Sequence, residues 1–164
     1  HLLTDDLRVL GPDHPHTLTT RSYLARWQGE AGDPTAAAIA FAQLLPDRLR
    51  VLGPDHPHTL TTRSHLARWQ GEAGDPTAAV TALEQLLPDR LRVLGPDHPH
   101  TLTTRSHLAR WRGEAGDPTA AATAFEQLLT DQLQVLGPDH PNTRKTRADL
   151  ASWRSKANDQ MGRP

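Results

Sequence analysis

The sequence predicts an all-α fold in which pairs of antiparallel helices stack into a solenoid. The segment LGPDHPHTLTTRS begins at Leu10, Leu52 and Leu94, and a fourth copy, LGPDHPNTRKTRA, begins at Leu136, so the chain repeats every 42 residues. Apolar residues within each repeat follow helical spacing, and no segment alternates with the two-residue period of a strand. One helix pair cannot bury its apolar face alone, so neighbouring repeats must stack.

Start and stop signals predict the first helix of each repeat. Asp13 or His14 can serve as N-cap, and Pro15 stands in the first turn, where its missing N–H costs nothing. Gly32 ends the helix, since glycine adopts the left-handed conformation at C′ easily. One side of this helix is expected to face the core, and it carries Arg21, Leu24, Gln28 and Ala31.

The second helix of the repeat has equally clear ends. Asp33 is expected to cap it, Pro34 occupies its first position and Gly53 stops it. Pro46 and Pro88 fall inside this helix in two repeats and predict a kink there. Its apolar face is predicted to contain Ala37, Phe41, Leu44, Leu45, Leu49 and Leu52.

The phase of the repeats predicts one domain over residues 1–164. It begins with the end of a second helix at 1–10, continues with helix pairs at 14–52, 56–94 and 98–136, and closes with a polar first helix at 140–156 and a tail at 157–164. A polar closing helix suits a cap that faces water. The beginning has no such cap, which predicts more solenoid or another domain before His1.

Composition excludes several classes of function. The net charge is −1, so no basic field favours nucleic acid or a membrane surface as partner. There is no cysteine, which excludes disulfides and thiolate sites, leaves the compartment open and favours a cytoplasmic location. No catalytic triad, phosphate loop or unique carboxylate pair is present, so we expect no enzyme and no cofactor.

Tryptophan and arginine recur at fixed positions of the repeat. Trp27, Trp69, Trp111 and Trp153 are predicted to pack between repeats, and stacking on bases is a poor alternative without a basic groove. Arg21, Arg63 and Arg105 flank the buried face and need carboxylate partners. We expect these partners to be Asp5, Asp47 and Asp89 on the preceding second helices.

The histidine pairs leave a metal site as an alternative. Asp-His-Pro-His occurs three times and Asp-His-Pro-Asn once. Imidazole suits Zn²⁺ or Ni²⁺, but two histidines are an incomplete ligand set, and corners of neighbouring repeats lie roughly 10 Å apart. We therefore expect local capping and packing roles, and no specific metal site.

The repeats resemble the tetratricopeptide repeat family. The family's Ala-x3-Phe pattern is present at Ala37/Phe41 and Ala121/Phe125, and its Leu-Gly/Ala pair resembles Leu24-Ala25. A 42-residue unit with HPxTL and RVLG is similar to the kinesin-light-chain subtype, which is common in bacterial regulatory proteins. The resemblance implies a right-handed α-solenoid of about 3.5 repeats and a non-enzymatic scaffold that binds a protein or peptide.

The first helices of such solenoids line a concave face, and the side of each helix opposite its predicted core is the candidate groove. Its Arg, Ser, Thr and His side chains suit an extended acidic peptide. Self-association through the uncapped N-terminal end is the alternative function. The predicted groove residues are Thr19, Ser22, Tyr23, Arg26, Thr61, Ser64, His65, Arg68, Thr103, Ser106, His107 and Arg110.

Overall fold

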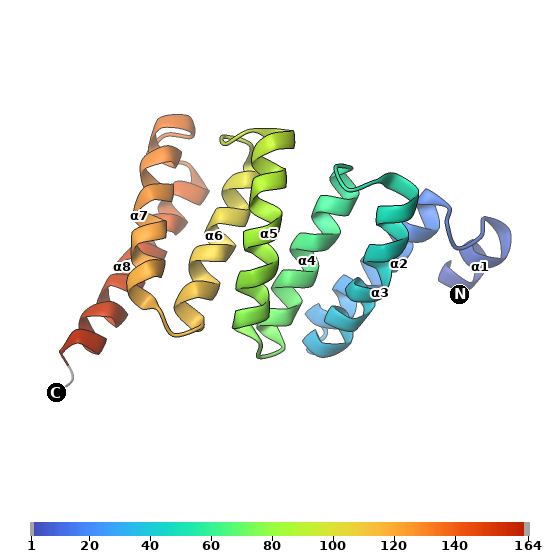
Figure 1. Cartoon of the computed structure of the whole chain (residues 1–164), viewed down its shortest axis with the longest axis horizontal. Helices are drawn as coiled ribbons and strands as arrows, with labels where there is room; N and C mark the ends of the chain where they lie inside the picture. Colours follow the sequence, from blue (N-terminus) through green and yellow to red (C-terminus); the bar gives the residue numbers. More distant parts are fainter. Residues whose placement is uncertain (1, 163–164) are drawn as a thin grey trace. The chain divides into compact units, whose positions relative to one another are not determined.

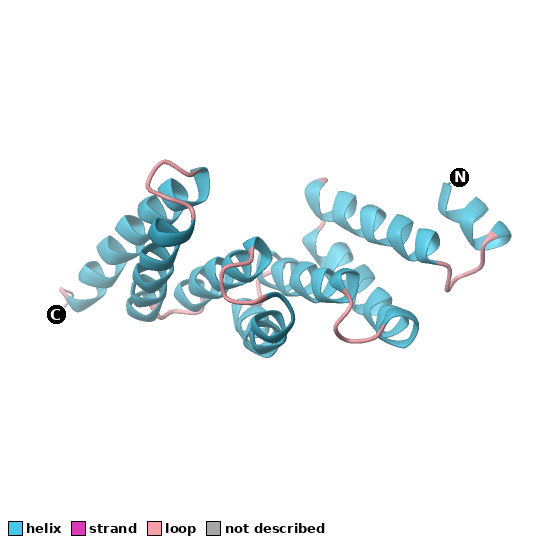
Figure 2. Cartoon of the chain, turned by 90° about the horizontal axis from the view of Figure 1, so that it is seen from above, coloured by secondary structure: helices cyan, strands magenta, loops and turns pink. Residues whose placement is uncertain are grey.

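The computed structural model describes residues 2–162. Over this range the chain forms eight helices and no strand, which confirms the all-α prediction (Figure 1). Loops and turns join consecutive helices (Figure 2). The helices are α1 (Leu2–Val9), α2 (Pro15–Glu30), α3 (Pro34–Leu52), α4 (Pro57–Glu72), α5 (Pro76–Leu94), α6 (Pro99–Glu114), α7 (Pro118–Val135) and α8 (Pro141–Met161).

The contacts divide the chain into two compact units. Unit 1 ends at Ala82 and unit 2 begins at Leu83, so the boundary lies inside α5. Unit 1 contains α1 to α4, and unit 2 contains α6 to α8. In unit 1, α3 packs against both α2 and α4, and in unit 2, α7 packs against both α6 and α8. A single solenoid over residues 1–164 stays a prediction.

The last helix is longer than predicted. It extends through residues 157–161, which were expected to form a tail, and ends at Gly162, whose N–H donates to the Asn158 carbonyl at 3.0 Å. Ala157 is buried and there is no glycine or proline between it and Gly162, so nothing stops the helix earlier. The predicted tail residues 163–164, and residue 1 of the predicted first segment, lie outside the described residues.

The predicted caps are present, and histidine takes a larger share of them than expected. His14, not Asp13, is the N-cap of α2: its Nδ1 accepts a hydrogen bond from the His16 N–H at 3.2 Å. His56, His98 and His140 cap α4, α6 and α8 in the same way. Because Nδ1 is the acceptor, each capping imidazole carries its proton on Nε2.

The core side of α2 differs from the prediction. Leu18, Ala25 and Gly29 are buried, whereas Leu24, Gln28 and Ala31 are exposed. Small residues lie where another helix comes close: an ideal Cβ built on Gly29 would lie only 2.5 Å from ring atoms of Trp69. Close packing of the next first helix, and not the position of the largest apolar side chains, therefore decides which side of α2 is buried.

The second helix buries a charged residue that the prediction passed over. Ala37, Phe41 and Leu44 lie in the core of unit 1 as expected, and Arg48 continues the same side of α3 with only 2% of its surface exposed. Leu49, which was predicted to be buried, is exposed. Ala37, Phe41, Leu44 and Arg48 follow one another at spacings of four, three and four residues, so all four lie on the same side of α3.

The core of unit 2 has the same plan. Phe125 and Leu128 of α7 pack with residues of α6 and α8, and the ring of Trp153 lies against Gly113. The closing helix α8 thus covers the last pair in the way that α4 covers α2 and α3. The buried cluster comprises Leu102, Ala109, Ala121, Ala122, Phe125, Leu128, Leu150 and Trp153.

Three of the four tryptophans are buried, and the prediction for Trp27 is wrong. Trp69, Trp111 and Trp153 are at most 6% exposed, whereas Trp27 is 59% exposed. Trp69 lies on a glycine of the first helix one repeat earlier. Among the described residues only the eight-residue α1 precedes α2, so Trp27 has no equivalent surface to cover.

Candidate functional site

Unit 1 contains a cavity of about 200 Å³ between α2, α3 and α4. Hydroxyls and aromatic or basic side chains from both first helices form its walls, and α3 contributes Arg48. Six of the predicted groove residues meet here. The lining residues are Thr19, Ser22, Tyr23, Arg26, Arg48, His58, Thr61 and His65.

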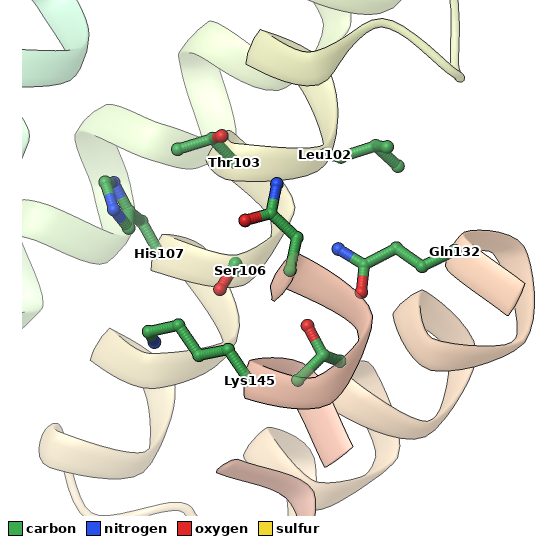
Figure 3. A pocket seen from close by; sticks show the side chains of 8 residues that line it. Leu102, Thr103, Ser106, His107, Gln132 and Lys145 are labelled. Atoms are coloured by element: carbon green, nitrogen blue, oxygen red, sulfur yellow. The ribbon is translucent and has the colours of Figure 1, made fainter. Parts of the chain in front are cut away.

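Unit 2 contains the corresponding cavity, of about 160 Å³, between α6, α7 and α8 (Figure 3). Three predicted groove residues, Thr103, Ser106 and His107, line it, and each lies 84 residues after a residue that lines the unit 1 cavity. The remaining lining residues are Leu102, Gln132, Asn142, Lys145 and Thr146.

The other predicted residues have different surroundings. Arg68 and Arg110 do not line either cavity. Their guanidinium carbons lie over the rings of Trp69 and Trp111, at 4.3 and 4.4 Å from the centroids. Ser64 does not line these cavities either. Stacking on a large aromatic ring fixes the position of an arginine side chain, so both guanidinium groups are held against the tryptophan of their own helix.

Arg48 is the functional candidate that sequence reasoning missed. Its Nη1 donates to the His58 carbonyl at 2.7 Å and its Nη2 to the Leu18 carbonyl at 3.1 Å, so it connects α4 to α2. Burial, followed by the positive charge of Arg21, lowers the pKa of Arg48. The sequence feature that could have revealed this residue is an arginine at helical spacing from Ala37 and Phe41, on the face of the second helix that was predicted to be apolar.

A second cavity of unit 1, of about 250 Å³, adjoins the first. It shares Thr19, Arg48 and His58 with that cavity, and its other lining residues are Pro15, Leu18, Leu52 and His56. Neither lining set contains an aspartate or a glutamate. Partial burial, the charge of Arg48 and the neighbouring His56 lower the pKa of His58, in that order. The lowered pKa favours neutral His58, so the buried cation that the two cavities share is Arg48.

Arginine–aspartate pairs form, but with aspartates of other second helices than predicted. Arg21 Nη1 lies 2.7 Å from Oδ2 of Asp47, and Arg105 Nη2 lies 2.6 Å from Oδ2 of Asp131. Each partner is on the second helix that follows the arginine, not on the preceding one, because the two helices of one pair align these positions. The pairs are partly buried and connect the two helices of a repeat.

Metal binding and membrane insertion find no support in the described part of the chain. No group of three or more His, Asp or Glu residues there is placed to hold a metal ion. The Nδ1 atoms of His14, His56, His98 and His140 are already used as helix caps. No helix in residues 2–162 combines the length and the apolar character needed to cross a membrane.

The fold and the cavities together define a helical-repeat protein with polar cavities between neighbouring first helices. The sequence model of the tetratricopeptide repeat matches residues 17–58, 59–100 and 101–142, so the chain belongs to the tetratricopeptide repeat family. Proteins with these repeats generally bind other proteins, and the fold is typical of non-enzymatic scaffolds.

Solved structures place the chain near kinesin light chains. It is similar to the nearly identical TPR-like repeats of a putative kinesin light chain of Podosopora anserina, with 27% identity and a TM-score of 0.80. A variant of the same repeats matches with 27% identity and a TM-score of 0.82. Each match covers 96% of this chain and 74% of the other.

A third structure supports the fold at greater distance. BtubC (BKLC) from P. vanneervenii has a TM-score of 0.77 at 17% identity, over 87% of this chain and 57% of its own. The three matches agree with the predicted tetratricopeptide solenoid of kinesin-light-chain type. No curated protein matches the sequence.

Proposed function

We propose that the chain is a peptide-binding module of a larger, cytoplasmic regulatory protein of bacterial origin, and that it binds an extended acidic peptide along its first helices. The carrying observation is the unit 1 cavity, where six predicted residues meet and the ionisable side chains are arginine, histidine and tyrosine. Arg guanidinium groups bind carboxylates through paired hydrogen bonds.

The arrangement of the polar side chains supports a peptide as ligand. Thr19 and Ser22 of α2 and Thr61 of α4 line the same cavity, so hydroxyls from two helices can bond to a main chain lying between them. Arg26 lies at the edge of this set, with its guanidinium 5.8 Å from the centre of the Tyr23 ring. An extended peptide presents both the carbonyls and the carboxylates that such groups bind.

Selection from a random 12-residue display library tests the proposal. Sequences enriched on the intact chain should be acidic, and a labelled peptide from the selection should lose at least about tenfold in affinity on Arg26→Ala. Arg8→Ala is the matched control, because it removes the same charge from α1, away from the cavity. Basic or neutral selected sequences, or equal losses in both variants, would disprove acidic-peptide binding in this groove.

Self-association is the second candidate function, and the exposed face of α2 favours it. Tyr23, Leu24 and Trp27 are all exposed there, which is unusual for three large apolar side chains on one helix. The equivalent Trp69 is 3% exposed. A surface of this kind favours contact with another helix.

The packing of tryptophan on glycine restricts how copies could join. Gly29 and Gly113 are covered by Trp69 and Trp153, and α8 carries Ser155 at the equivalent position. A Cβ there would collide with an incoming indole, so Trp27 of one copy cannot dock on α8 of another in the repeat geometry. Light scattering over a concentration series tests the alternative. A mass that rises with concentration and falls in Trp27→Ser supports it, and a constant monomer mass excludes it.

A further inference from the structure

We propose that the two corresponding cavities select different ligand groups, an inference that rests on the proposed peptide-binding function. The unit 1 cavity over Arg48 binds one anionic group of a peptide, a carboxylate or a phosphate. The unit 2 cavity over Gln132 binds an uncharged hydrogen-bond donor, such as an amide or hydroxyl side chain. The difference follows from one position of the repeat, which is Arg in the first cavity and Gln in the second.

Arg48 provides a buried cation without a carboxylate partner in the described part of the chain. Its two donated bonds go to main-chain carbonyls, and its Nε is buried with no hydrogen-bond acceptor. Carbonyl dipoles offset the charge only in part, since burial still lowers the pKa of Arg48. An anion beside the guanidinium therefore gains a charge-assisted interaction in an environment that water screens poorly.

No carboxylate among the lining residues opposes this preference. Arg26, His58 and His65 line the same cavity, and His56 joins them in the adjoining one. The nearby carboxylates belong to other pairs: Asp47 accepts hydrogen bonds from Arg21 and Arg50 on the outer side of α3. Arg26 pairs with Glu30 at 3.3 Å, and the lowered pKa of His58 favours its neutral form. Arg48 is therefore the cation on which the preference of this cavity depends.

The unit 2 cavity has a neutral floor. Gln132 is 3% exposed, and its Oε1 is buried without a hydrogen-bond donor. Figure 3 shows its side chain extending from α7 toward α6, on the side where Ser106 lies. Lys145 Nζ at the rim pairs with Asp149 Oδ2 at 2.8 Å, so the nearest cation already has a counterion.

An unsatisfied buried carbonyl oxygen favours a ligand that donates. A buried acceptor without a partner costs free energy, and a ligand N–H or O–H that reaches it removes this cost. A carboxylate in the same place would gain no bond from Oε1, and the NH2 group of Gln132 offers it a neutral donor in place of a guanidinium cation. Gln132 therefore favours a carboxylate less than Arg48 does.

Nuclear magnetic resonance titrations of the whole chain test the inference with three probes: inorganic phosphate, N-acetyl-glutamate N-methylamide and N-acetyl-glutamine N-methylamide. At constant ionic strength the two anionic probes should shift the amide signals of Thr19, Ser22 and Thr61. The glutamine probe should shift those of Thr103 and Ser106. Comparing phosphate with the glutamate probe shows which anion the first cavity prefers.

Exchanging the floor residues provides matched variants. Arg48→Gln should weaken the anion response of unit 1 by about tenfold or more, and Gln132→Arg should create a response in unit 2. Circular dichroism checks that each variant folds, and Gln132→Arg carries the test if Arg48→Gln does not fold. The inference would be overturned if both cavities responded equally to the anionic probes. It would also be overturned if Gln132→Arg gave unit 2 no response to them.

The outcome is separable from that of the proposed function, because the probes are inorganic phosphate and single capped amino acids and none is an extended peptide. If display selects acidic peptides but the probes shift no signals, the anion subsite is rejected and the peptide groove is kept. If the probes shift the expected signals but display selects no acidic peptide, the anion site is kept and peptide binding is rejected.

Discussion

Replacing Gly29 with alanine tests how the repeats fit together. The added Cβ would lie 2.5 Å from Cη2 and Cζ3 of Trp69, whereas carbon atoms in ordinary contact are about 3.5–4.0 Å apart. The indole would have to move by about 1 Å or more. Trp69 is 3% exposed and Arg68 lies over its ring, so there is little room for this movement.

Two opposing terms set the expected magnitude. Alanine is about 0.8–1.0 kcal/mol better than glycine inside a helix. Overpacking costs about 1–3 kcal/mol, and complete expulsion of the indole approaches the roughly 3–5 kcal/mol of a Trp→Ala substitution. The net result lies between about zero and 4 kcal/mol of destabilisation, and we expect about 2 kcal/mol because the indole is rigid and enclosed.

Urea unfolding followed by circular dichroism measures this effect in two backgrounds. In the intact chain Gly29→Ala should lower the free energy of unfolding. With Trp69 replaced by alanine, the same change should raise it by about 1 kcal/mol, since only the helix propensity remains. A stabilising Gly29→Ala in the intact chain, or an equal cost in both backgrounds, would refute the packing of tryptophan on glycine.

Three further predictions concern stability. Trp69→Ala should cost about 3–5 kcal/mol in urea unfolding and Trp27→Ala less than about 1 kcal/mol, because only the first is buried; equal costs would contradict this. Burial beside a guanidinium lowers the pKa of His58 and His100. The unfolded chain therefore binds protons first, and stability is full above about pH 6.5 and falls as the pH drops toward the folded pKa. Urea midpoints at about pH 7.5 and 5 check this, and replacing both histidines with asparagine should flatten the difference. Asp33→Ala should cost about 1 kcal/mol through the lost N-cap, and Asp33→Asn much less, by the same assay.

Helix ends were predictable because single residues determine them. Asp33 caps α3 through a 2.8 Å bond from the Ala36 N–H, Pro34 follows it, and Gly53 ends the helix with a φ of 85°. Each signal acts within a few residues along the chain, so it can be read without knowing what packs where. The helix pairs and the resemblance to tetratricopeptide repeats followed from the same local information.

The buried side of the first helix was not predictable in the same way. Leu24 is the larger apolar residue, yet Ala25 and Gly29 are buried. Helices of this kind contact neighbours on more than one side, and close approach requires small residues where the spacing rule favours large ones. The direction of the Arg21–Asp47 pair depends in the same way on how two helices align, which repeat spacing alone leaves open.

The candidate site was half predictable, for a related reason. Thr19, Ser22 and Thr61, which were predicted as groove residues, line one cavity, because these positions of neighbouring first helices face the same space; that they bind a ligand stays a prediction. Arg48 was missed because a charged residue on the buried side of a second helix contradicts the usual pattern. Two main-chain carbonyls make this burial possible, and these acceptors are visible only once α2 and α4 are in place.

Near-identical repeats hold the geometry constant and change the chemistry at few positions. The hydroxyls of Thr19 and Ser22 return as Thr103 and Ser106, so the two cavities share two hydroxyls at equivalent positions. The floor changes from Arg48 to Gln132, and the rim changes from Tyr23 to His107, from His58 to Asn142 and from Thr61 to Lys145. These substituted side chains line the cavities, whereas Gly29 and Gly113, on which Trp69 and Trp153 pack, occupy the same repeat position and are unchanged. Exchanging Arg48 and Gln132 should therefore exchange ligand preference, and Gln132→Arg tests this without removing the bonds from Arg48 to the Leu18 and His58 carbonyls.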